Sequence, residues 1–588
     1  MQHGTVQPEL ITRYTDALGA EREAPAWAVT RVEELLASVE ATGDVVEVHR
    51  LSPGQPTGPL AGRTLTLEDG ATVLLGDVVP DDLPIGYHAV DAEGGTGLVL
   101  HAPRRVPAAR RGWVLAAQLY AARSKRSWGQ GDLRDARTLA TWAREAGDGL
   151  LMVNPLHAAI PGTDPQPSPY FASTRVFREP LYLAVDEVPG PKRRDLRTAQ
   201  REALDGTDRI DRRRAWSAKR SALVARWPTA SADPATVAAI DRWLTDDVNA
   251  RYAAFCVERD PRDVGADPRF HAWLQLLVDE QVLAVGGNLV NDVAVGVDRA
   301  GADVAMWPDC FVDEGTRIGC PPDQFNTLGQ DWGLPPLHPV NLRARGYEPF
   351  VRAVRAATHG AAGIRLDHVM ALDRTFWIPE GASPADGVYV KYPLDEMLDV
   401  VAIEAHRAGT FVVGEDLGTV PASIPVALEA RGILSYRVVS LDSNHPSSFP
   451  TRTMAAVTTH DLPTMVGLLT GSDLEDQQRL DLSPNVDGTW EAVGRLRHWV
   501  GSDGSDRDAE VLRIHEMVSA SPADLACVTL DDLAATPLRP NMPGTIDEWP
   551  NWRIPLPAPL GEILATDRAT RLRGAMAART PAHDGADR

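Results

Sequence analysis

From residue 113 onward, short apolar runs alternate with stretches of helical periodicity, and this alternation restricts the possible folds more than any other feature. Patterns of helical period follow some of the runs, as in RDARTLATWAREAG and LDEMLDVVAIEAHRAG. Eight strands with helices between them predict an α/β fold, a (β/α)8 TIM barrel. The eight candidate strands are WVLAAQLY (113–120), GLLMVNPL (149–156), QVLAVGGNLVNDVAV (281–295), GIRLD (363–367), TFVVGED (410–416), ILSYRVVSL (433–441), MAAVTTHD (454–461) and ACVTLDDL (526–533).

A doubly wound open sheet is the main structural alternative. No GxGxxG or Walker loop follows any of the runs, so nucleotide binding on such a sheet has no support. Two gaps between the runs are too long for plain connections. We expect a helical insertion at about 185–280, which is dense in Arg, Ala, Asp and Trp, and an active-site loop insertion at about 300–355, which is rich in Pro, Gly, Asn and Trp.

The first 107 residues have a different texture. A short helical pattern, TRVEELLASVEA (30–41), precedes alternating apolar segments such as DVVEVHRL and TGLVLHA, which indicate β-structure. APRRVPAARRG (102–112) has the composition of a linker. We therefore predict an N-terminal domain over 1–107, with a helical segment and a β-sandwich-like part, and a catalytic barrel over 108–588. The tail TPAHDGADR is predicted to be disordered.

Composition narrows the classes of function. The formal charge of −22 argues against a nucleic-acid partner, which requires a basic face. No apolar run approaches the ~20 residues of a membrane span, and the N-terminus MQHGTVQPEL does not resemble a secretory signal, so we expect a cytoplasmic protein without a membrane partner. The four cysteines lack CxxC spacing and are expected to be reduced thiols: Cys256, Cys310, Cys320 and Cys527.

Polar side chains gather where the candidate strands end. In a (β/α)8 barrel the carboxyl ends of the strands meet at one mouth, where catalysis takes place. A single acidic residue after a strand is more often a helix cap or turn residue, but three acidic strand ends with adjacent histidines are harder to explain by capping. The strand-end residues are Asn154, His157, Arg365, Asp367, His368, Glu415, Asp416, His460 and Asp461.

Two of these carboxylates have surroundings that favour opposite protonation states. The two-residue period of a strand places Arg365 and Asp367 on one face, where the guanidinium favours the charged form of the aspartate. Glu415 follows the apolar run FVVG, and burial would raise its pKa, as a general acid requires. Such a pair is typical of retaining glycosidases, whose two carboxyl groups lie ~5–5.5 Å apart. A structural ion pair is the alternative for Arg365 and Asp367 alone.

Three loops mix aromatic residues with Asn, Gln, Asp and Ser: 166–177, 321–337 and 541–553. Sugars favour this mixture, because pyranose faces stack on aromatic rings while hydroxyl groups need directional donors and acceptors. The same residues also fit packed anchors of long loops, and the Gly and Pro of 319–339 fit a mobile lid. The candidate sugar-binding residues are Tyr170, Gln330, Trp332, Asn541 and Trp552.

These motifs, taken in order, resemble the amylomaltases, or 4-α-glucanotransferases (disproportionating enzymes), of glycoside hydrolase family 77 in the α-amylase clan. The resemblance covers about 110–555, and the segment DLPIGYHAV with LVLHAP resembles the β-sandwich that precedes the barrel in the bacterial branch with long N-termini. One motif departs from the family, whose loop often begins SPTGQ where this chain has NTLGQ. The resemblance rests on SWGQGDL, NPLHA, QPSPY, VGVDRAGAD, GCPPDQFNTLGQDWGLPPL, RLDHVMALDRTFWIP, VVGEDLGTVP, LSYRV, THDLPT and NMPGTIDEWPNWR.

The resemblance implies a role for each matching position. Asp367 would be the nucleophile that carries a covalent glucosyl intermediate, Glu415 the general acid and base, and Asp461 the stabiliser of the transition state. The donor and acceptor would be maltooligosaccharides and other α-1,4-glucans, with no cofactor and no metal, in a monomer or a homodimer. The residues implied to bind substrate are Arg365, His368, His460, Asp416, Ser168, Tyr170, Gln330, Trp332 and Asn541.

Three alternatives remain open at this point. An α-glucan hydrolase of the same clan shares the carboxylates and differs in outcome, and a silent glucan-binding barrel shares the fold. A metal-dependent barrel hydrolase would use strand-end residues as ligands, but it would also need an HxH near the first strand, and QLYAARS has none. Its candidate ligands are Asp367, His368, Glu415, His460 and Asp461.

Overall fold

The structure is a computed structural model that describes residues 8–16, 19–39, 42–162, 164–322 and 329–579. The predicted disorder of 580–588, and the residues 323–328 of the predicted lid, lie outside the described residues. The chain divides into two compact units, which are described separately. Unit 1 comprises Met1–Ala108, Val293–His359 and Ile364–Ser435, and unit 2 comprises Ala109–Asp292, Gly360–Gly363 and Tyr436–Arg588.

All eight predicted barrel strands are present. They form one sheet in the order β17-β14-β11-β10-β9-β20-β19-β18, and the neighbouring strands among β9, β10, β11, β19 and β20 pair in parallel. Val413 of β17 also forms a parallel bridge with Leu434, one residue before β18, which joins the two ends of this order. The fold is therefore the predicted (β/α)8 TIM barrel. Its strands are β9 (Gly112–Ala117), β10 (Leu150–Val153), β11 (Leu289–Val293), β14 (Gly363–Leu366), β17 (Phe411–Gly414), β18 (Ser435–Val438), β19 (Thr453–Ala456) and β20 (Leu525–Thr529).

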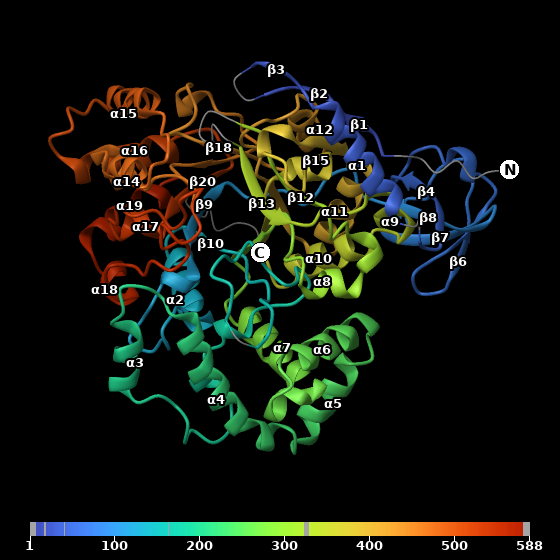
Figure 1. The fold of residues 1–588 in the computed structure, drawn as a ribbon, viewed down its shortest axis with the longest axis horizontal. Helices are drawn as coiled ribbons and strands as arrows, with labels where there is room; N and C mark the ends of the chain where they lie inside the picture. The colour runs from blue at the N-terminus through green and yellow to red at the C-terminus, as the bar shows by residue number, and fades with distance from the viewer. Residues whose placement is uncertain (1–7, 17–18, 40–41, 163, 323–328, 580–588) are drawn as a thin grey trace, which may run out of the picture. The chain divides into compact units, whose positions relative to one another are not determined.

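Helices of two kinds accompany these strands. Some cover the barrel, such as α11 (Leu394–Ala408), whose apolar side packs into the buried core of unit 1 with α10 (Glu348–Thr358). Others fill the predicted insertion of unit 2, where α4 to α7 lie together (Figure 1). The helices up to this insertion are α1 (Ala26–Ser38), α2 (Leu133–Arg144), α3 (Thr198–Asp205), α4 (Arg212–Ala230), α5 (Pro234–Trp243), α6 (Asp247–Arg259) and α7 (Pro268–Leu283).

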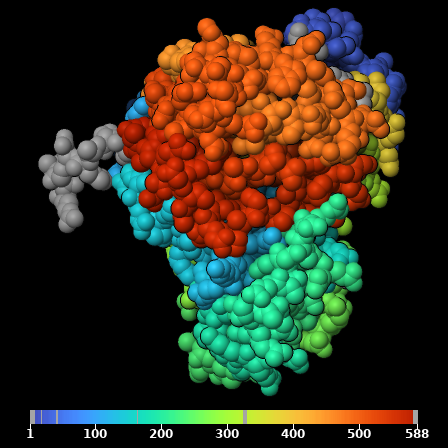
Figure 2. Space-filling model, turned by 90° about the vertical axis from the view of Figure 1, so that its left-hand side faces the viewer, coloured from blue at the N-terminus to red at the C-terminus, as the bar shows by residue number. Residues whose placement is uncertain are grey.

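The remaining helices follow the insertion. Those after residue 460 belong to unit 2, and Figure 2 shows their segments, coloured orange to red, as one continuous surface. No helix in the described ranges has the length and apolar character to cross a membrane. These helices are α8 (Ala302–Met306), α9 (Pro339–Ala344), α10 (Glu348–Thr358), α11 (Leu394–Ala408), α12 (Ser423–Arg431), α13 (Met465–Thr470), α14 (Ser472–Arg479), α15 (Val486–Val500), α16 (Arg507–Ser519), α17 (Leu530–Leu533), α18 (Leu560–Leu564) and α19 (Asp567–Ala577).

The segment 300–355, for which the sequence predicts a long loop, contains regular structure. Besides α8, α9 and most of α10, it carries two strands that join a second sheet of order β1-β16-β15-β12-β13. Pairing with strands more than 50 residues later, such as Ile318 with Trp377, stabilises strands whose own Gly-rich sequence is a weak signal. The strands are β1 (Leu10–Ile11), β12 (Thr316–Cys320), β13 (Gln330–Leu334), β15 (Arg374–Pro379) and β16 (Val388–Lys391).

The N-terminal segment builds a five-stranded sheet of order β4-β8-β7-β5-β6. Alternate residues of its strands, among them Leu65, Val90 and Val99, form a small apolar core. The predicted boundary at residue 107 stays a prediction. The strands are β4 (Val45–Leu51), β5 (Thr64–Thr66), β6 (Thr72–Leu74), β7 (Gly86–Ala92) and β8 (Gly95–His101), beside a separate hairpin of β2 (Arg13–Thr15) and β3 (Glu21–Glu23).

Candidate active site

Strand β14 carries a buried arginine next to a partly exposed aspartate. Arg365 Nη2 lies 2.9 Å from Asp367 Oδ1, and the two side chains are 5% and 20% exposed. The neighbouring Ile364 and Leu366 pack in the apolar core with α10 and α11, as the strand period predicts. The ion pair therefore holds a charged carboxylate at the end of a barrel strand, with one side open to solvent.

Glu415 follows β17 and lies beside this pair. Its carboxylate accepts hydrogen bonds from the backbone N–H groups of His368 (2.9 Å) and Leu417 (2.8 Å). Burial raises the pKa of Glu415 to about 7, Arg365 opposes the shift, and the negative charge of Asp367 adds to it. The predicted raised pKa is thus supported, and near neutral pH this carboxyl group can both give and take a proton.

His368 connects this group to the segment 330–334. It has a left-handed backbone conformation, with φ of 44°, directly after Asp367, and its ring packs edge-on against Trp332 with centroids 5.0 Å apart. The Trp332 Nε1–H donates to Gln330 Oε1 at 3.3 Å. Burial lowers the pKa of His368 to about 4, with Arg374 adding to the shift, so this imidazole is neutral at pH 7.

Asp416 is buried beside Glu415 and makes a different contact. Its Oδ2 accepts a hydrogen bond from Ser435 Oγ at 2.6 Å, at the start of β18. Adjacent strand ends of unit 1 therefore place five predicted site residues, from Arg365 to Asp416, in one neighbourhood, and His368 links them to Trp332 and Gln330.

Unit 2 holds a second group of predicted residues, after β19. His460 Nε2 lies 3.1 Å from Asp461 Oδ2, and Asn541 Nδ2 donates to Asp461 Oδ1 at 2.7 Å. The Arg539 guanidinium donates to the Asp461 carbonyl at 3.1 Å, and it also forms an ion pair with the buried Asp473. The Asp461 side chain is nevertheless 46% exposed, so it remains available to a ligand.

An aromatic cluster supports His460. The ring of Tyr170 stacks on it with centroids 4.8 Å apart, and Trp552 lies 5.4 Å from Tyr170 and 5.5 Å from His460. Ser168 accepts from the Tyr170 backbone N–H at 3.3 Å through its hydroxyl group. Four predicted residues from two loops, namely Ser168 and Tyr170 of one and Asn541 and Trp552 of the other, thus lie around His460 and Asp461.

One residue of this group was missed by the sequence reasoning. The Tyr170 hydroxyl donates to Asp292 Oδ2 at 2.5 Å, and Asp292 is a buried residue of β11. Its signal was a carboxylate near the end of the apolar run NLVNDVAV, which carries a charge that an ordinary core strand does not need. The contact fixes the direction of the Tyr170 ring.

Neither group is arranged as a metal centre. Within the described ranges, no set of three or more His, Cys, Asp or Glu side chains has the arrangement that could hold a metal ion. The four cysteines are not joined in disulfides. The chemistry that the geometry does support is proton transfer by Glu415 next to a charged carboxylate, Asp367.

Comparison with known proteins identifies the family of this chain. The profile of the family described as 4-alpha-glucanotransferase, glycoside hydrolase family 77, matches residues 117–266 and 257–560. The 4-alpha-glucanotransferase of Mycobacterium tuberculosis is 38% identical over 578 residues, which cover 85% of this chain and 80% of the relative. That of Haemophilus influenzae is 28% identical, with 82% of each chain covered.

A solved structure extends the likeness to nearly the whole chain. The crystal structure of amylomaltase from Corynebacterium glutamicum superposes with a TM-score of 0.83 and 26% identity, covering 97% of this chain and 98% of that one. The profile match over most of the barrel, the mycobacterial relative and this superposition agree with one another. The chain belongs to glycoside hydrolase family 77 and is a 4-alpha-glucanotransferase.

Proposed function

We propose that Asp367 is the nucleophile and Glu415 the general acid and base of a retaining double displacement. The observation that carries this assignment is the pairing of opposite environments: Arg365 keeps Asp367 charged, while burial keeps Glu415 protonated up to a pH of about 7. A nucleophile must be charged and an acid must hold its proton, so the two carboxyl groups can act at the same pH.

The first step breaks the glycosidic bond. Glu415 protonates the oxygen between two glucose units while an Asp367 oxygen attacks the anomeric carbon, so the donor chain remains on Asp367 as an ester. The displaced glucan leaves as a free alcohol. In the second step Glu415, now charged, takes the proton from the 4-hydroxyl of an acceptor glucan, and that oxygen displaces Asp367. Each displacement inverts the anomeric carbon, so the two together retain its configuration.

The remaining predicted residues would bind the sugar. Asp461, held by Asn541 and the neighbouring His460, is proposed to accept hydrogen bonds from hydroxyl groups of the glucose unit at the reacting carbon. Tyr170 offers its ring for stacking. The other predicted substrate-binding residues would line neighbouring subsites: Arg365, His368, Asp416, Ser168, Gln330 and Trp332.

The proposed donors and acceptors are maltooligosaccharides and other α-1,4-glucans. A glucan acceptor rather than water requires that water be kept from the ester, a task that we assign to the segment 319–339, of which 319–322 and 329–339 are described. The four cysteines, which are not joined in disulfides, support a cytoplasmic location.

Incubation with maltotriose tests the proposal. Transfer produces glucose together with a ladder of longer maltooligosaccharides, because each donated segment is added to another glucan. Shortening of maltotriose to glucose and maltose, without longer products, would favour a hydrolase. Activity should also be unchanged after treatment with a chelator, and loss of activity that returns with a divalent metal would favour the metal-dependent alternative.

A further inference from the structure

The last barrel strand, β20, is followed by two aspartates that no step of the mechanism above uses. Asp531 and Asp532 come directly after this strand, in the short helix α17 (Leu530–Leu533). Strand β20 pairs in parallel with β9 on one side and with β19, the strand that leads to His460 and Asp461, on the other. Because the carboxyl ends of the barrel strands meet at one mouth, the two aspartates follow β20 at the same end of the barrel as the groups that we assign to sugar binding.

Asp532 is directed away from the mouth, into the surrounding helices. Its Oδ1 accepts a hydrogen bond from the backbone N–H of Met465, in α13, at 3.0 Å. Its Oδ2 lies 3.4 Å from Nε2 of His515, in α16, and both side chains are 0% exposed. Asp532 therefore joins the end of β20 to two helices, and its role is structural.

Asp531 faces the mouth instead. It is half-buried, and its negative charge acts on two groups at the mouth. The positive charge of His460 favours the charged form of Asp531. Burial raises the pKa of the Tyr120 hydroxyl, and the negative charges of Asp531 and Asp461 both add to that shift. Asp531 therefore lies near the residues of unit 2 that carry the proposed sugar contacts.

The carboxylate of Asp531 is open to a ligand. In the part of the chain that the structure describes, no hydrogen bond or ion pair joins this carboxylate to another residue. Its oxygens are not enclosed, in contrast to Oδ2 of Asp532. Acceptors that are withdrawn from bulk water destabilise a fold unless a donor reaches them, so they are found where water or a ligand supplies the missing bond.

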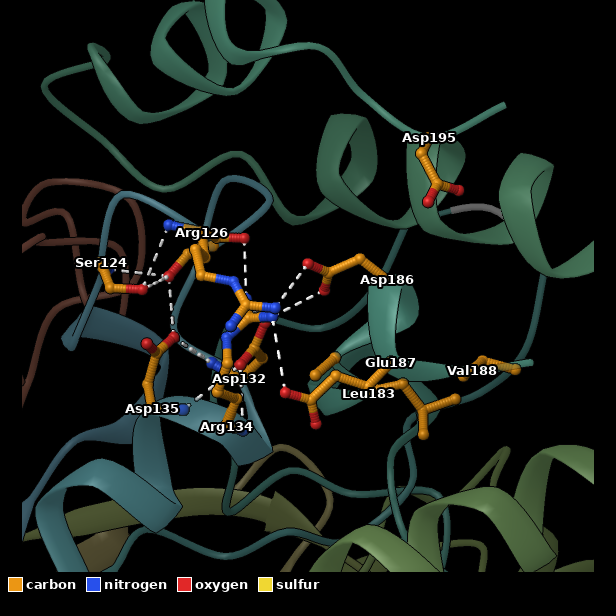
Figure 3. Close-up of polar contacts among 12 residues, drawn as sticks. Ser124, Arg126, Asp132, Arg134, Asp135, Leu183, Asp186, Glu187, Val188 and Asp195 are labelled. Carbon is orange, nitrogen blue, oxygen red and sulfur yellow. Dashed lines mark hydrogen bonds and ion pairs between the residues drawn. The ribbon is translucent and has the colours of Figure 1, made fainter. Parts of the chain in front are cut away.

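A raised pKa is not what distinguishes this carboxyl group. Burial raises the pKa of Asp531 to about 7, and the charge of Asp532 adds to the shift. Figure 3 shows another buried aspartate, Asp132 at the start of α2, with Arg134 between it and Asp186. Its own protein neighbours supply hydrogen bonds to Asp132, whereas the oxygens of Asp531 receive none from other described residues.

The backbone around Asp531 is fixed. Its carbonyl accepts a hydrogen bond from the N–H of Thr536 at 3.2 Å. The next carbonyl, that of Asp532, accepts from Arg568 Nε at 2.7 Å, and Thr529 Oγ1 caps the Asp532 N–H at 3.1 Å. The side chain is therefore presented from a rigid segment, and binding would not require this segment to be ordered first.

The chemistry of the group favours a ligand with hydroxyl groups. A charged carboxylate has acceptor positions for two hydroxyl donors, and such charge-assisted hydrogen bonds are stronger than neutral ones. An anionic ligand would be repelled by Asp531 and Asp461. Together these two aspartates offer acceptors and His460 offers a ring nitrogen, so the three can hold several hydroxyl groups of one sugar ring.

We propose that Asp531 is a further substrate-binding residue, whose carboxylate accepts a hydrogen bond from a hydroxyl group of the same glucose unit that Asp461 binds. This inference rests on the proposed glucan transfer and adds a contact to its site. Because that unit is present in every productive complex, the contact contributes equally for short and long glucans.

Binding of maltotriose tests the inference in a background that does not turn over. Calorimetry measures the Kd of Asp367→Ala, and we expect it to rise about tenfold when Asp531→Ala is added, as the loss of a hydrogen bond to a charged group implies. Asp531→Asn keeps an acceptor oxygen and should lose less, about threefold. The matched control is Asp487→Ala, at an exposed aspartate in the first turn of α15, and it should leave the Kd unchanged.

Two further measurements separate binding from a structural role. The kcat/KM of Asp531→Ala should fall by the same factor with maltotriose and with maltoheptaose. Its melting temperature should equal or exceed that of the wild type, because the variant removes a carboxylate without a donor.

An unchanged Kd, or a loss confined to one chain length, would overturn the inference and leave Asp531 as a solvated residue of the helix start. A wild type that makes no longer glucans from maltotriose would instead overturn the proposed transfer, and the Kd comparison would still decide whether Asp531 binds the sugar.

Discussion

Two clusters of carboxylates and cations, one in each unit, raise the pKa of a buried carboxyl group by similar causes but have very different surroundings. Asp132 lies in the network of Figure 3, where burial raises its pKa to about 7, Asp135 adds to the shift, and Lys219 and Arg134 oppose it. Glu415 has a pKa of about 7 for the same kinds of reason. A perturbed pKa alone therefore does not distinguish a catalytic carboxyl group from a structural one.

The difference lies in what surrounds the two carboxyl groups. Asp132 is 1% exposed, and its oxygens accept from the backbone N–H groups of Arg134 and Asp135 at the start of a helix. Glu415 lies next to Asp367, whose side chain is 20% exposed at the end of a barrel strand. The cluster of Asp132, Arg134 and Asp186 is satisfied by its own contacts, and we call it the closed cluster. The cluster of Arg365, Asp367 and Glu415, which we call the open cluster, presents a charged oxygen to the barrel mouth, where a substrate can reach it.

The largest expected effect is at the open cluster. Asp367→Ala should reduce maltotriose transfer by ~10³-fold or more, because it removes the carboxylate on which the covalent ester is proposed to form. Its midpoint of urea unfolding should stay near that of the wild type. Asp186→Ala, in the closed cluster, is the matched control and should retain kcat. Substantial residual transfer by Asp367→Ala would refute its role as nucleophile.

Glu415→Gln should have the second-largest effect, a loss of ~10²–10⁴-fold in kcat, which is the usual contribution of a general acid and base. Glu415 must be protonated for the first step, so the wild-type rate should fall as the pH rises above about 7. Glutamine does not titrate, and the residual activity of the variant should lack this alkaline decline. The pH profiles of kcat/KM for the wild type and the variant measure the two rates. If the variant keeps the same alkaline decline, a group other than Glu415 causes that decline.

Lys219→Met should lower stability and leave catalysis unchanged, which is the opposite of the result expected for Asp367→Ala. Lys219 is fully buried, its Nζ donates to the carbonyls of Leu181 (2.7 Å) and Leu183 (2.9 Å), and its positive charge favours the charged form of Asp132. Its removal leaves two buried carbonyls without their donor and leaves Arg134 as the only one of the two cations near Asp132, which should lower the free energy of unfolding by about 3 kcal/mol. The kcat of the folded fraction should be unchanged. Urea unfolding measures the first quantity, and a loss below about 1 kcal/mol would contradict the closed-cluster interpretation.

The sequence predicts the open cluster better than the closed one. Barrel strands are short apolar runs, so polar residues at their ends, such as Asp367 and Glu415, are conspicuous in the sequence. Asp292 was missed because its meaning depends on Tyr170, from a distant loop. The opposite directions of Asp531 and Asp532 follow from how their neighbours fold, and strands β12 and β13 depend on pairing within a sheet whose other strands lie far along the chain. Local periodicity carries neither kind of information.

The last prediction concerns how stability depends on pH. The folded pKa of Asp132 is about 7 against an ordinary value of 3.8, so between these values the folded state binds more protons than the unfolded state. The free energy of unfolding should therefore fall as the pH rises from about 4 to about 7, by at most about 1.4 kcal/mol per pH unit for this group. Asp132→Asn keeps an acceptor for the helix cap and removes the titration, so its unfolding free energy should depend less steeply on pH in this range.

Because Glu415 contributes a decline of the same sign, the comparison with Glu415→Gln separates the two clusters: each variant should remove its own share of the slope, while only Glu415→Gln changes the pH profile of transfer. A slope that is unchanged in Asp132→Asn would show that this carboxyl group titrates alike in the folded and unfolded chain.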